Sequence, residues 1–344
     1  MKYPIPHALA AAVALLAVGS ASAQSSVTLT GLADSYVGSM RMAGDSERVS
    51  TVGSGGMTTS WVGMKGTEDL GGGLRAGFNF TSFLRMNTGA AGRFDGDTMW
   101  SRDANITLEG GFGKFTLGRW VAPNFLPSIL FNPFGDSFVF SPLVLHADVS
   151  LFNGTQWGGT TPSDTGWSSQ VAYTTPNFNG LTVTLQYQFR SELSTDNRYN
   201  VGGHLLYFNG PIGLTAFYER AEVGNPVANP FADGSRRTNW MVGGSYDFKA
   251  VKLFATYGQA KNNVSDVQIK TAQLGASIPL GTGKVLASIA QSKNDGLDKT
   301  RRTATIGYDY FLSKRTDLYA NVMYDHITSY SSGTSYGIGL RHAF

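Results

Sequence analysis

The chain has 344 residues, of which 42% are hydrophobic and only 15% are charged, and its formal net charge is +3. Charged residues make up about 25% of typical soluble domains, and the 43 glycines and 12% aromatic residues argue against both disorder and coiled coil. The chain has no cysteine, which excludes disulfides, thiolate metal sites and cysteine nucleophiles. The small, dispersed positive charge gives no reason to expect nucleic-acid binding.

Residues 1–23 have the pattern of a cleaved signal peptide. Lys2 precedes an apolar run over residues 8–18, and the small-residue stretch that follows ends in Ala21-Ser22-Ala23. The run is too short to cross a bilayer, which takes about 20 apolar residues in a helix, and no later stretch is long enough. We therefore expect a mature chain of residues 24–344 that leaves the cytoplasm without a membrane helix.

Strict alternation of apolar and polar residues recurs along the mature chain in blocks of about ten residues. In the block at residues 74–81, Leu74, Ala76, Phe78 and Phe80 share one face. Four later blocks alternate in the same way: 181–190, 239–247, 318–325 and 335–344. Short glycine-rich turns and longer polar loops connect the blocks in alternation, which is typical of outer-membrane barrels.

The spacing of these blocks predicts about 16 strands. Unpaired backbone groups cost several kcal/mol each in lipid, so strands that cross a membrane must close into a barrel. A barrel of this strand number is too wide for side chains to fill, and its lumen holds water. A secreted soluble all-β protein is the alternative reading of the same alternation.

Residues 121–168 form the longest region without clean alternation. Loops longer than about 15 residues are usually functional or disordered. This one carries too many aromatic residues for a disordered segment, among them Phe131, Phe134 and Phe140. We expect an ordered loop that folds into the barrel lumen, with a cap over the outer mouth of the barrel as the alternative.

Five segments, in order along the chain, carry a resemblance to a known family: Ser26–Gly31, Gly66–Leu74, Gly113–Arg119, Leu312–Tyr319 and Gly337–Phe344. On these residues the chain resembles the trimeric general porins of the Gram-negative outer membrane, of the beta-proteobacterial Neisseria and Burkholderia type. The resemblance implies an all-β, 16-stranded antiparallel transmembrane β-barrel with its long third loop folded into the lumen. It also implies a homotrimer in outer-membrane lipid that passes ions and small hydrophilic solutes. Phe344 resembles the C-terminal signal that the outer-membrane assembly machinery reads.

The resemblance also points to residues of the pore and to departures from the family pattern. In the family, the strand before the Glu68-Asp69 turn typically carries an arginine that lines the narrow part of the pore, and here Trp61 takes that inward place. Arg102 matches another lumen arginine, whereas the third basic position falls near Gly166. The usual Pro-Glu-Phe-Gly-Gly motif of the loop is missing. The basic wall is therefore thinner than in the family, and the loop is more aromatic.

Alternation alone predicts that three basic residues point inward: Arg75, Arg190 and Lys252. Arg102 and Arg119 share the parity of apolar neighbours, but an arginine that faces lipid near the midplane costs about 2–4 kcal/mol. We therefore expect both in the pore wall, and for Arg119 an interface or loop-anchoring role stays open. Asp136 and Asp148 are the predicted opposing charges on the loop.

Charges at the narrowest point of a wet pore filter the ions that pass. These candidates predict passive diffusion with a weak preference for anions. Trp61 and the loop phenylalanines raise an alternative, a substrate-specific channel for aromatic or organic-acid solutes, because aromatic rings offer stacking surfaces. The simpler explanation is that these rings pack the loop against the wall.

A barrel enzyme needs a nucleophile or an activated water beside a base. Four histidines of the mature chain lie in separate segments without a triad or metal spacing: His146, His204, His326 and His342. We expect no catalytic site, no metal and no cofactor. An outer-membrane barrel enzyme or an adhesin is the remote alternative, and an adhesin would not need a polar lumen this wide.

Overall fold

The computed structural model describes residues 26–148, 151–152, 155–156, 164–190, 197–225, 229–231 and 234–344. The signal peptide predicted for residues 1–23 lies outside this part of the chain and stays a prediction. Trp157 of the long loop also lies outside it.

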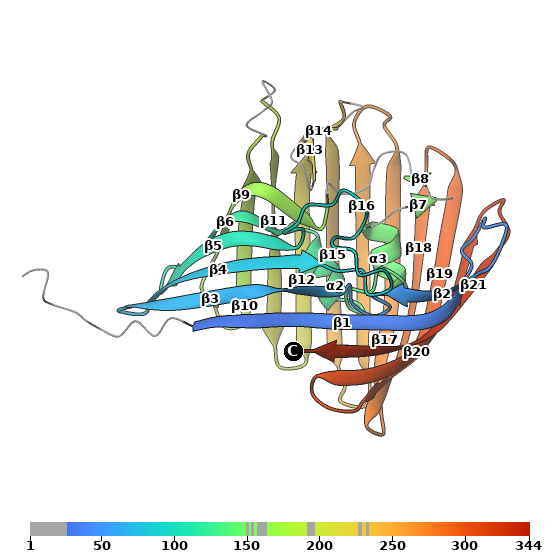
Figure 1. The fold of residues 1–344 in the computed structure, drawn as a ribbon. Coiled ribbons are helices and arrows are strands. Elements are labelled where there is room, and N and C mark those ends of the chain that lie inside the picture. The colour runs from blue at the N-terminus through green and yellow to red at the C-terminus, as the bar shows by residue number, and fades with distance from the viewer. Residues whose placement is uncertain are drawn as a thin grey trace, which may run out of the picture.

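Neighbouring antiparallel strands form one continuous curved wall (Figure 1). The strands of this wall are β1 (Ser26–Met40), β3 (Trp61–Gly71), β4 (Leu74–Phe83), β5 (Asp103–Gly110), β6 (Gly113–Val121), β9 (Gly166–Thr174), β10 (Leu181–Gln188), β11 (Asn200–Asn209), β12 (Ile212–Ala221), β15 (Arg237–Asp247), β16 (Lys252–Asn262), β17 (Gln268–Leu280), β18 (Gly283–Asn294), β19 (Lys299–Phe311), β20 (Thr316–Ile327) and β21 (Gly333–Ala343).

One further strand, β2 (Val49–Ser54), completes the 17-stranded sheet. It pairs with the second half of β1, whereas β3 pairs with the first half of β1. The two strands thus occupy one position in the wall, which leaves 16 positions around it. The predicted 16-stranded antiparallel barrel is confirmed.

The barrel closes between the first and last strands. β21 pairs with β1 from Leu32 opposite Ala343 to Ser39 opposite Tyr336. Phe344 extends this ladder, because its backbone N–H and C=O both bond to Gly31 at 3.0 Å. Closure leaves no open sheet edge, which removes the cost of unpaired backbone groups in lipid.

Burial is inverted relative to a soluble protein. On β12, Leu214 and Tyr218 are 48% and 51% exposed on the outer face, while Thr215 and Glu219 are buried on the inner face. The same inversion continues on the neighbouring strands, where large apolar side chains are exposed and polar ones are buried. Alternation places these polar residues toward the lumen, as a lipid-embedded barrel with a wet interior requires.

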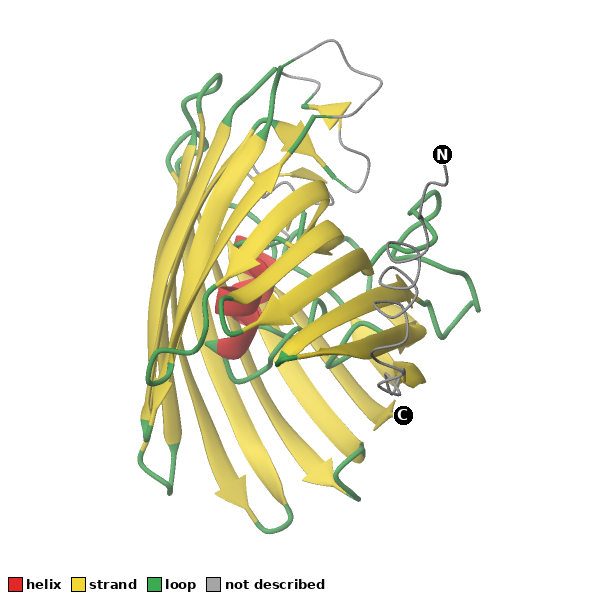
Figure 2. Ribbon diagram, turned by 90° about the vertical axis from the view of Figure 1, so that its left-hand side faces the viewer, coloured by secondary structure: helices red, strands yellow, loops and turns green. Residues whose placement is uncertain are grey.

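Two short helices of the long loop, α2 (Phe125–Leu130) and α3 (Pro142–Ala147), lie within the ring of strands (Figure 2). Two small hairpins lie outside the wall sheet: β7 (Leu151–Phe152) with β8 (Thr155–Gln156), and β13 (Val223–Gly224) with β14 (Asn229–Pro230). In the described part of the chain, no helix has both the length and the apolar character needed to cross a membrane.

Candidate functional site

The connection between β2 and β3 is held in one conformation by hydrogen bonds to Asp34. The buried carboxylate of Asp34, on the inner face of β1, accepts hydrogen bonds from the backbone N–H groups of Gly56, Met57 and Thr58 at 2.8–2.9 Å. The hydroxyl of Tyr319 on β20 donates to the same carboxylate. Asp34 thereby fixes the wall segment that the long loop packs against.

The middle of the long loop is held by apolar packing. Phe134 and Phe140 are buried in a cluster with Tyr36, Met57 and Tyr319 of the wall. The rings of Phe140 and Tyr36 meet edge to face, with centroids 5.8 Å apart. Because Phe131, Phe134 and Phe140 are at most 1% exposed, these rings pack the loop and offer no open stacking surface.

Helix α3 is fixed to the wall through His146. Its two ring nitrogens each lie 2.7 Å from a hydroxyl, Ser292 Oγ on β18 and Thr303 Oγ1 on β19. Burial lowers the pKa of His146 to about 3, the nearby charge of Arg301 adds to this effect, and Asp325 opposes it. The ring is therefore neutral near pH 7 and joins the two hydroxyls as one donor and one acceptor.

Asp148, a predicted opposing charge, joins the two loop helices. Its carboxylate accepts from Asn124 Nδ2 at 3.0 Å and from Ser128 Oγ at 2.7 Å. Burial raises the pKa of Asp148 to about 7, although these two hydrogen bonds favour the charged form. The structure thus places this residue at a contact within the loop.

Asp136, the other predicted loop charge, faces the wall. Its Oδ1 accepts from Thr58 Oγ1 at 2.9 Å, and Thr58 also accepts from Arg341 Nη1 at 3.0 Å. Burial raises the pKa of Asp136, while the Thr58 hydrogen bond and the charges of Arg341 and Arg102 act in the opposite direction. The structure thus brings Asp136 within electrostatic reach of a predicted wall arginine.

Arg102 and Trp61 form a single unit. The guanidinium carbon of Arg102 lies 4.2 Å from the centroid of the Trp61 ring, within the range of cation–π contact. Its Nη1 also binds Asp103 Oδ2 at 2.7 Å. Arg102 precedes the first residue of β5, so the alternation of that strand does not apply to it. Its guanidinium consequently reaches inner-face partners although its number has the parity of outer-face residues.

Arg119 has the parity of the outward-facing Phe115 and Leu117, yet its side chain is only 7% exposed. A bulge between Gly118 and Trp120 shifts the pairing of β6 with β9 at this point. Gly118 has φ +118, and a Cβ there would lie 2.3 Å from the carbonyl oxygen of Ala104. The bulge therefore needs glycine, and it turns Arg119 inward.

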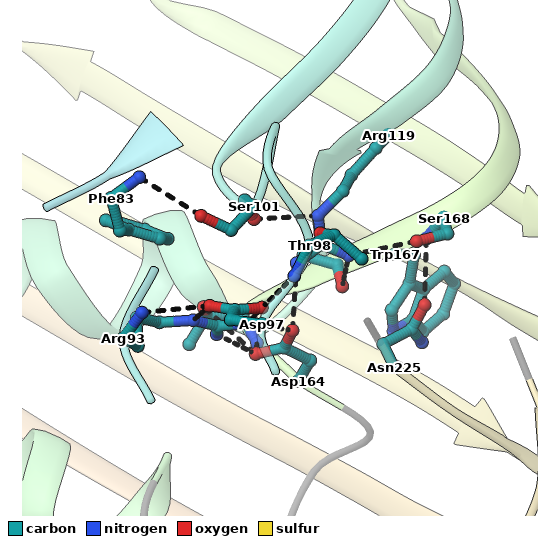
Figure 3. A network of polar contacts seen from close by, with 12 residues as sticks. Phe83, Arg93, Asp97, Thr98, Ser101, Arg119, Asp164, Trp167, Ser168 and Asn225 are labelled. Atoms are coloured by element: carbon teal, nitrogen blue, oxygen red, sulfur yellow. Dashed lines mark hydrogen bonds and ion pairs between the residues drawn. The ribbon is translucent and has the colours of Figure 1, made fainter. Parts of the chain in front are cut away.

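Arg119 joins a buried ionic network at the returning end of the long loop (Figure 3). We call its four charged residues the loop latch: Arg93, Asp97, Arg119 and Asp164. Asp164 lies between Arg93 Nη1 at 2.6 Å and Arg119 Nη2 at 3.0 Å, and Arg93 Nε binds Asp97 at 2.9 Å. Burial alone would raise the pKa of Asp164, but the two arginines hold it below its usual range.

The remaining donors of Arg119 bind the backbone oxygens of Ser101 and Gly166 and the hydroxyl of Ser168, at 2.7–3.1 Å. These contacts match the loop-anchoring role that the sequence left open, and they leave little of the guanidinium for the pore. Arg93 had no sequence signal, because it lies in an irregular loop without periodicity.

The other three predicted charges lie near the ends of strands. Arg75 is exposed beside the short turn Gly71–Gly73. Arg190 is exposed beyond the end of β10, where its Nη1 donates to Asn197 Oδ1 at 2.9 Å. Lys252 is half-buried at the first position of β16. The structure therefore brings Arg102, Trp61 and Asp136 together and leaves these three apart from them.

Alternation did not predict a row of four charged residues that meet on the inner wall. Arg341 Nε binds Asp317 at 3.1 Å, its Nη2 lies 3.5 Å from Asp309, and Lys284 Nζ lies 3.7 Å from the same carboxylate. These residues lie on four successive strands, β18 to β21, close to the short turns. Alternation in the last strand does place Arg341 on the polar face, but it cannot show which charges meet across strands.

Comparisons with known proteins agree with this architecture. The family model described as Gram-negative porin matches residues 8–329. Outer membrane porin protein 32 of Delftia acidovorans is 32% identical over 98% of this chain and 99% of its own length. Major outer membrane protein P.IB of Neisseria meningitidis is 26% identical over 83% of each chain. The solved structure of an anion-selective porin from Comamonas acidovorans superposes with a TM-score of 0.78 at 26% identity, over 93% of this chain and all of that one.

Proposed function

Since this chain belongs to the family of Gram-negative porins, outer-membrane proteins that form wet β-barrel channels, we propose that it passes ions and small hydrophilic solutes with a weak preference for anions. The observation that carries the preference is the Arg102 guanidinium on the Trp61 ring at the inner wall. The exposure of about one-third of the Arg102 side chain supports a role for its charge in the lumen.

The preference is weak because wall cations and carboxylates are interleaved. Arg102 pairs with Asp103 at 2.7 Å, and Asp136 feels both Arg102 and Arg341. Each carboxylate cancels part of the field that an anion would meet at the narrowest point. The similarity to a relative named as anion-selective supports the sign of the preference.

The contacts of Trp61 favour a diffusion channel over a channel in which Trp61 binds aromatic solutes. One face of its ring is already covered by Arg102, and the phenylalanines of the loop core are buried. We propose that the Trp61 ring fixes the position of the Arg102 guanidinium.

We further propose that the protein is a non-enzymatic channel, that it assembles as a homotrimer in outer-membrane lipid, and that Phe344 serves as the assembly signal. Phe344 is 47% exposed at the closing ladder of the barrel, where a machinery that joins the first and last strands can reach it. Chemical cross-linking of the purified protein, with a trimer as the largest product, tests the oligomeric state.

The selectivity is tested by Arg102→Ala in a planar bilayer under a potassium chloride gradient. We expect the anion-to-cation permeability ratio to fall about two- to fivefold, which is the effect of removing one partly screened charge. Arg190→Ala is the matched control, because Arg190 lies exposed at the end of β10, and it should leave the ratio unchanged. A reversal potential that is the same in Arg102→Ala and wild type would refute the assigned role.

A further inference from the structure

A cavity of about 300 Å³ lies between the long loop and the charged row of the inner wall. The loop contributes residues 129–135 to its lining, including Pro133, and the wall contributes Phe254 of β16. The cationic side chains of Lys252, Lys284 and Arg341 also line it. The size is at the lower end of the range of small-molecule sites, about 300–1,000 Å³.

The charges of this cavity are unequally paired. Arg341 is held by Asp317 and Asp309, and Lys284 shares Asp309. Lys252 lies opposite Asp247 in the register of β15 with β16, but Asp247 is not part of the cavity lining, and within the described residues no ion pair joins the two. The Lys252 ammonium lies 5.1 Å from the centroid of the Phe254 ring. The lining of the cavity therefore holds three cations and one carboxylate, that of Asp309, and Lys252 lies beside an aromatic ring.

The Asp309 carboxylate lies near the two cations of the charged row without a hydrogen bond to either. Its side chain is only 1% exposed, yet neither carboxylate oxygen has a hydrogen-bond donor among the described residues. The nearby Lys284 and Arg341 lie beyond hydrogen-bond distance, at 3.7 and 3.5 Å. The Lys284 ammonium can turn toward an anion that enters the cavity, whereas Arg341 stays bound to Asp317 and Thr58.

We infer that this cavity is a binding subsite for a monovalent arenecarboxylate on the short-turn side of the long loop. The carboxylate group binds the Lys252 ammonium, with Lys284 as the second donor. The ring of the solute contacts Phe254 and Pro133, both of which line the cavity. A single negative charge compensates the charge of Lys252, whereas a dianion also meets the field of Asp309.

This inference rests on the proposed channel function, because the solute reaches the cavity through the water-filled lumen. It differs from that function in predicting saturation, since a sieve has no site that fills. The subsite is also separate from the Arg102–Trp61 pair, which belongs to other strands of the wall. A site-specific measurement can therefore fail while the ion conductance stays intact.

The experiment measures the ion current of the folded, membrane-reconstituted protein in potassium chloride while sodium benzoate is added. We expect a saturable reduction of the current by benzoate. Acetate, which has the charge without the ring, and benzyl alcohol, which has the ring without the charge, should each block far less at equal concentration. A benzoate effect that is linear in concentration, or equal to that of acetate, would overturn the subsite.

Variants locate the site. Lys252→Gln should raise the half-blocking benzoate concentration about tenfold, as expected for the loss of a charge-assisted contact, and Lys252→Arg should retain most of the block. Lys65→Gln is the matched control, because Lys65 is a lysine of the same inner wall on β3, outside the cavity. An unchanged half-blocking concentration in Lys252→Gln would contradict the inference. If the wild-type protein itself carried no potassium chloride current, the proposed channel function would be wrong instead.

Discussion

The returning end and the middle of the long loop are attached to the same wall by different interactions. At the returning end, the loop latch holds two arginines against Asp164, and nearly every donor of Arg119 has a partner. In the middle, buried phenylalanines pack on Tyr36 and Met57, and the neutral ring of His146 joins two hydroxyl groups.

The difference shows how a polar lumen can hold a loop that lacks basic residues. A buried charge must be paired, so the latch fixes one geometry and tolerates no missing partner. Each apolar contact or neutral hydrogen bond contributes less to the free energy of unfolding, so the loss of one contact destabilises the loop less. We therefore expect substitutions at the latch to have larger effects than substitutions in the middle.

The largest effect is expected for Arg119→Ala. It leaves the buried Asp164 with one cation and removes the donors to Ser101 and Gly166, so the free energy of unfolding should fall by about 3–5 kcal/mol. Urea unfolding in lipid vesicles, followed by electrophoretic mobility, measures it. The exposed Arg190→Ala should change it by less than about 0.5 kcal/mol. Equal losses in the two variants would remove the distinction between the latch and the rest of the loop.

His146→Ala should have an intermediate effect. It removes two neutral hydrogen bonds, each of which contributes about 1 kcal/mol, so we expect a loss of about 2 kcal/mol and faster hydrogen exchange in α3. His326→Ala is the control, because His326 contacts a single hydroxyl, that of Ser332, near the end of β20. A loss in His146→Ala as large as that in Arg119→Ala would show that the middle is held as rigidly as the latch.

At α3 we also expect a pair of opposing pH dependences. The pKa of His146 is lowered to about 3, so its contribution to loop stability is present above about pH 6.5 and is lost as the pH falls toward 3. The pKa of Asp148 is raised to about 7, so its contribution is present below about pH 4 and is lost as the pH rises toward 7.

Single variants separate these two dependences. Asp148→Asn should leave only the loss of stability in acid, and His146→Gln should leave only the loss between about pH 4 and 7. Hydrogen exchange of residues 125–148 at pH 5 and pH 8 measures both. If Asp148→Asn showed the wild-type profile, the Asp148 carboxyl group would not be the one that titrates.

The sequence predicted most of the fold because alternation is a local property. A period of two residues assigns each side chain to one face of a strand, and lipid outside with water inside makes that assignment visible in the residue types. Leu214 and Tyr218 against Thr215 and Glu219 show the pattern directly. The number of strands and the closed barrel follow from the same signal.

The site was predictable only in part, because side-chain contacts depend on register and on local breaks in alternation. Alternation in β6 predicts that Arg119 points outward, but the bulge at Gly118 turns its side chain inward. Arg102 lies before the first residue of β5, so the alternation of that strand does not determine its direction. Asp148 was predicted as an opposing charge on the loop, but alternation could not show its hydrogen bonds to Asn124 and Ser128, which join α2 and α3.

The sequence by itself determined the class of the protein, the all-β barrel and the place of the long aromatic loop in the chain. Only the tertiary structure decided which side chains meet: Arg102 with Trp61, Arg119 with Asp164, and Arg341 with Asp309. The physical reason is distance along the chain. Alternation is set by neighbouring residues, whereas each of these contacts joins different segments through strand pairing, loop folding and closure of the barrel.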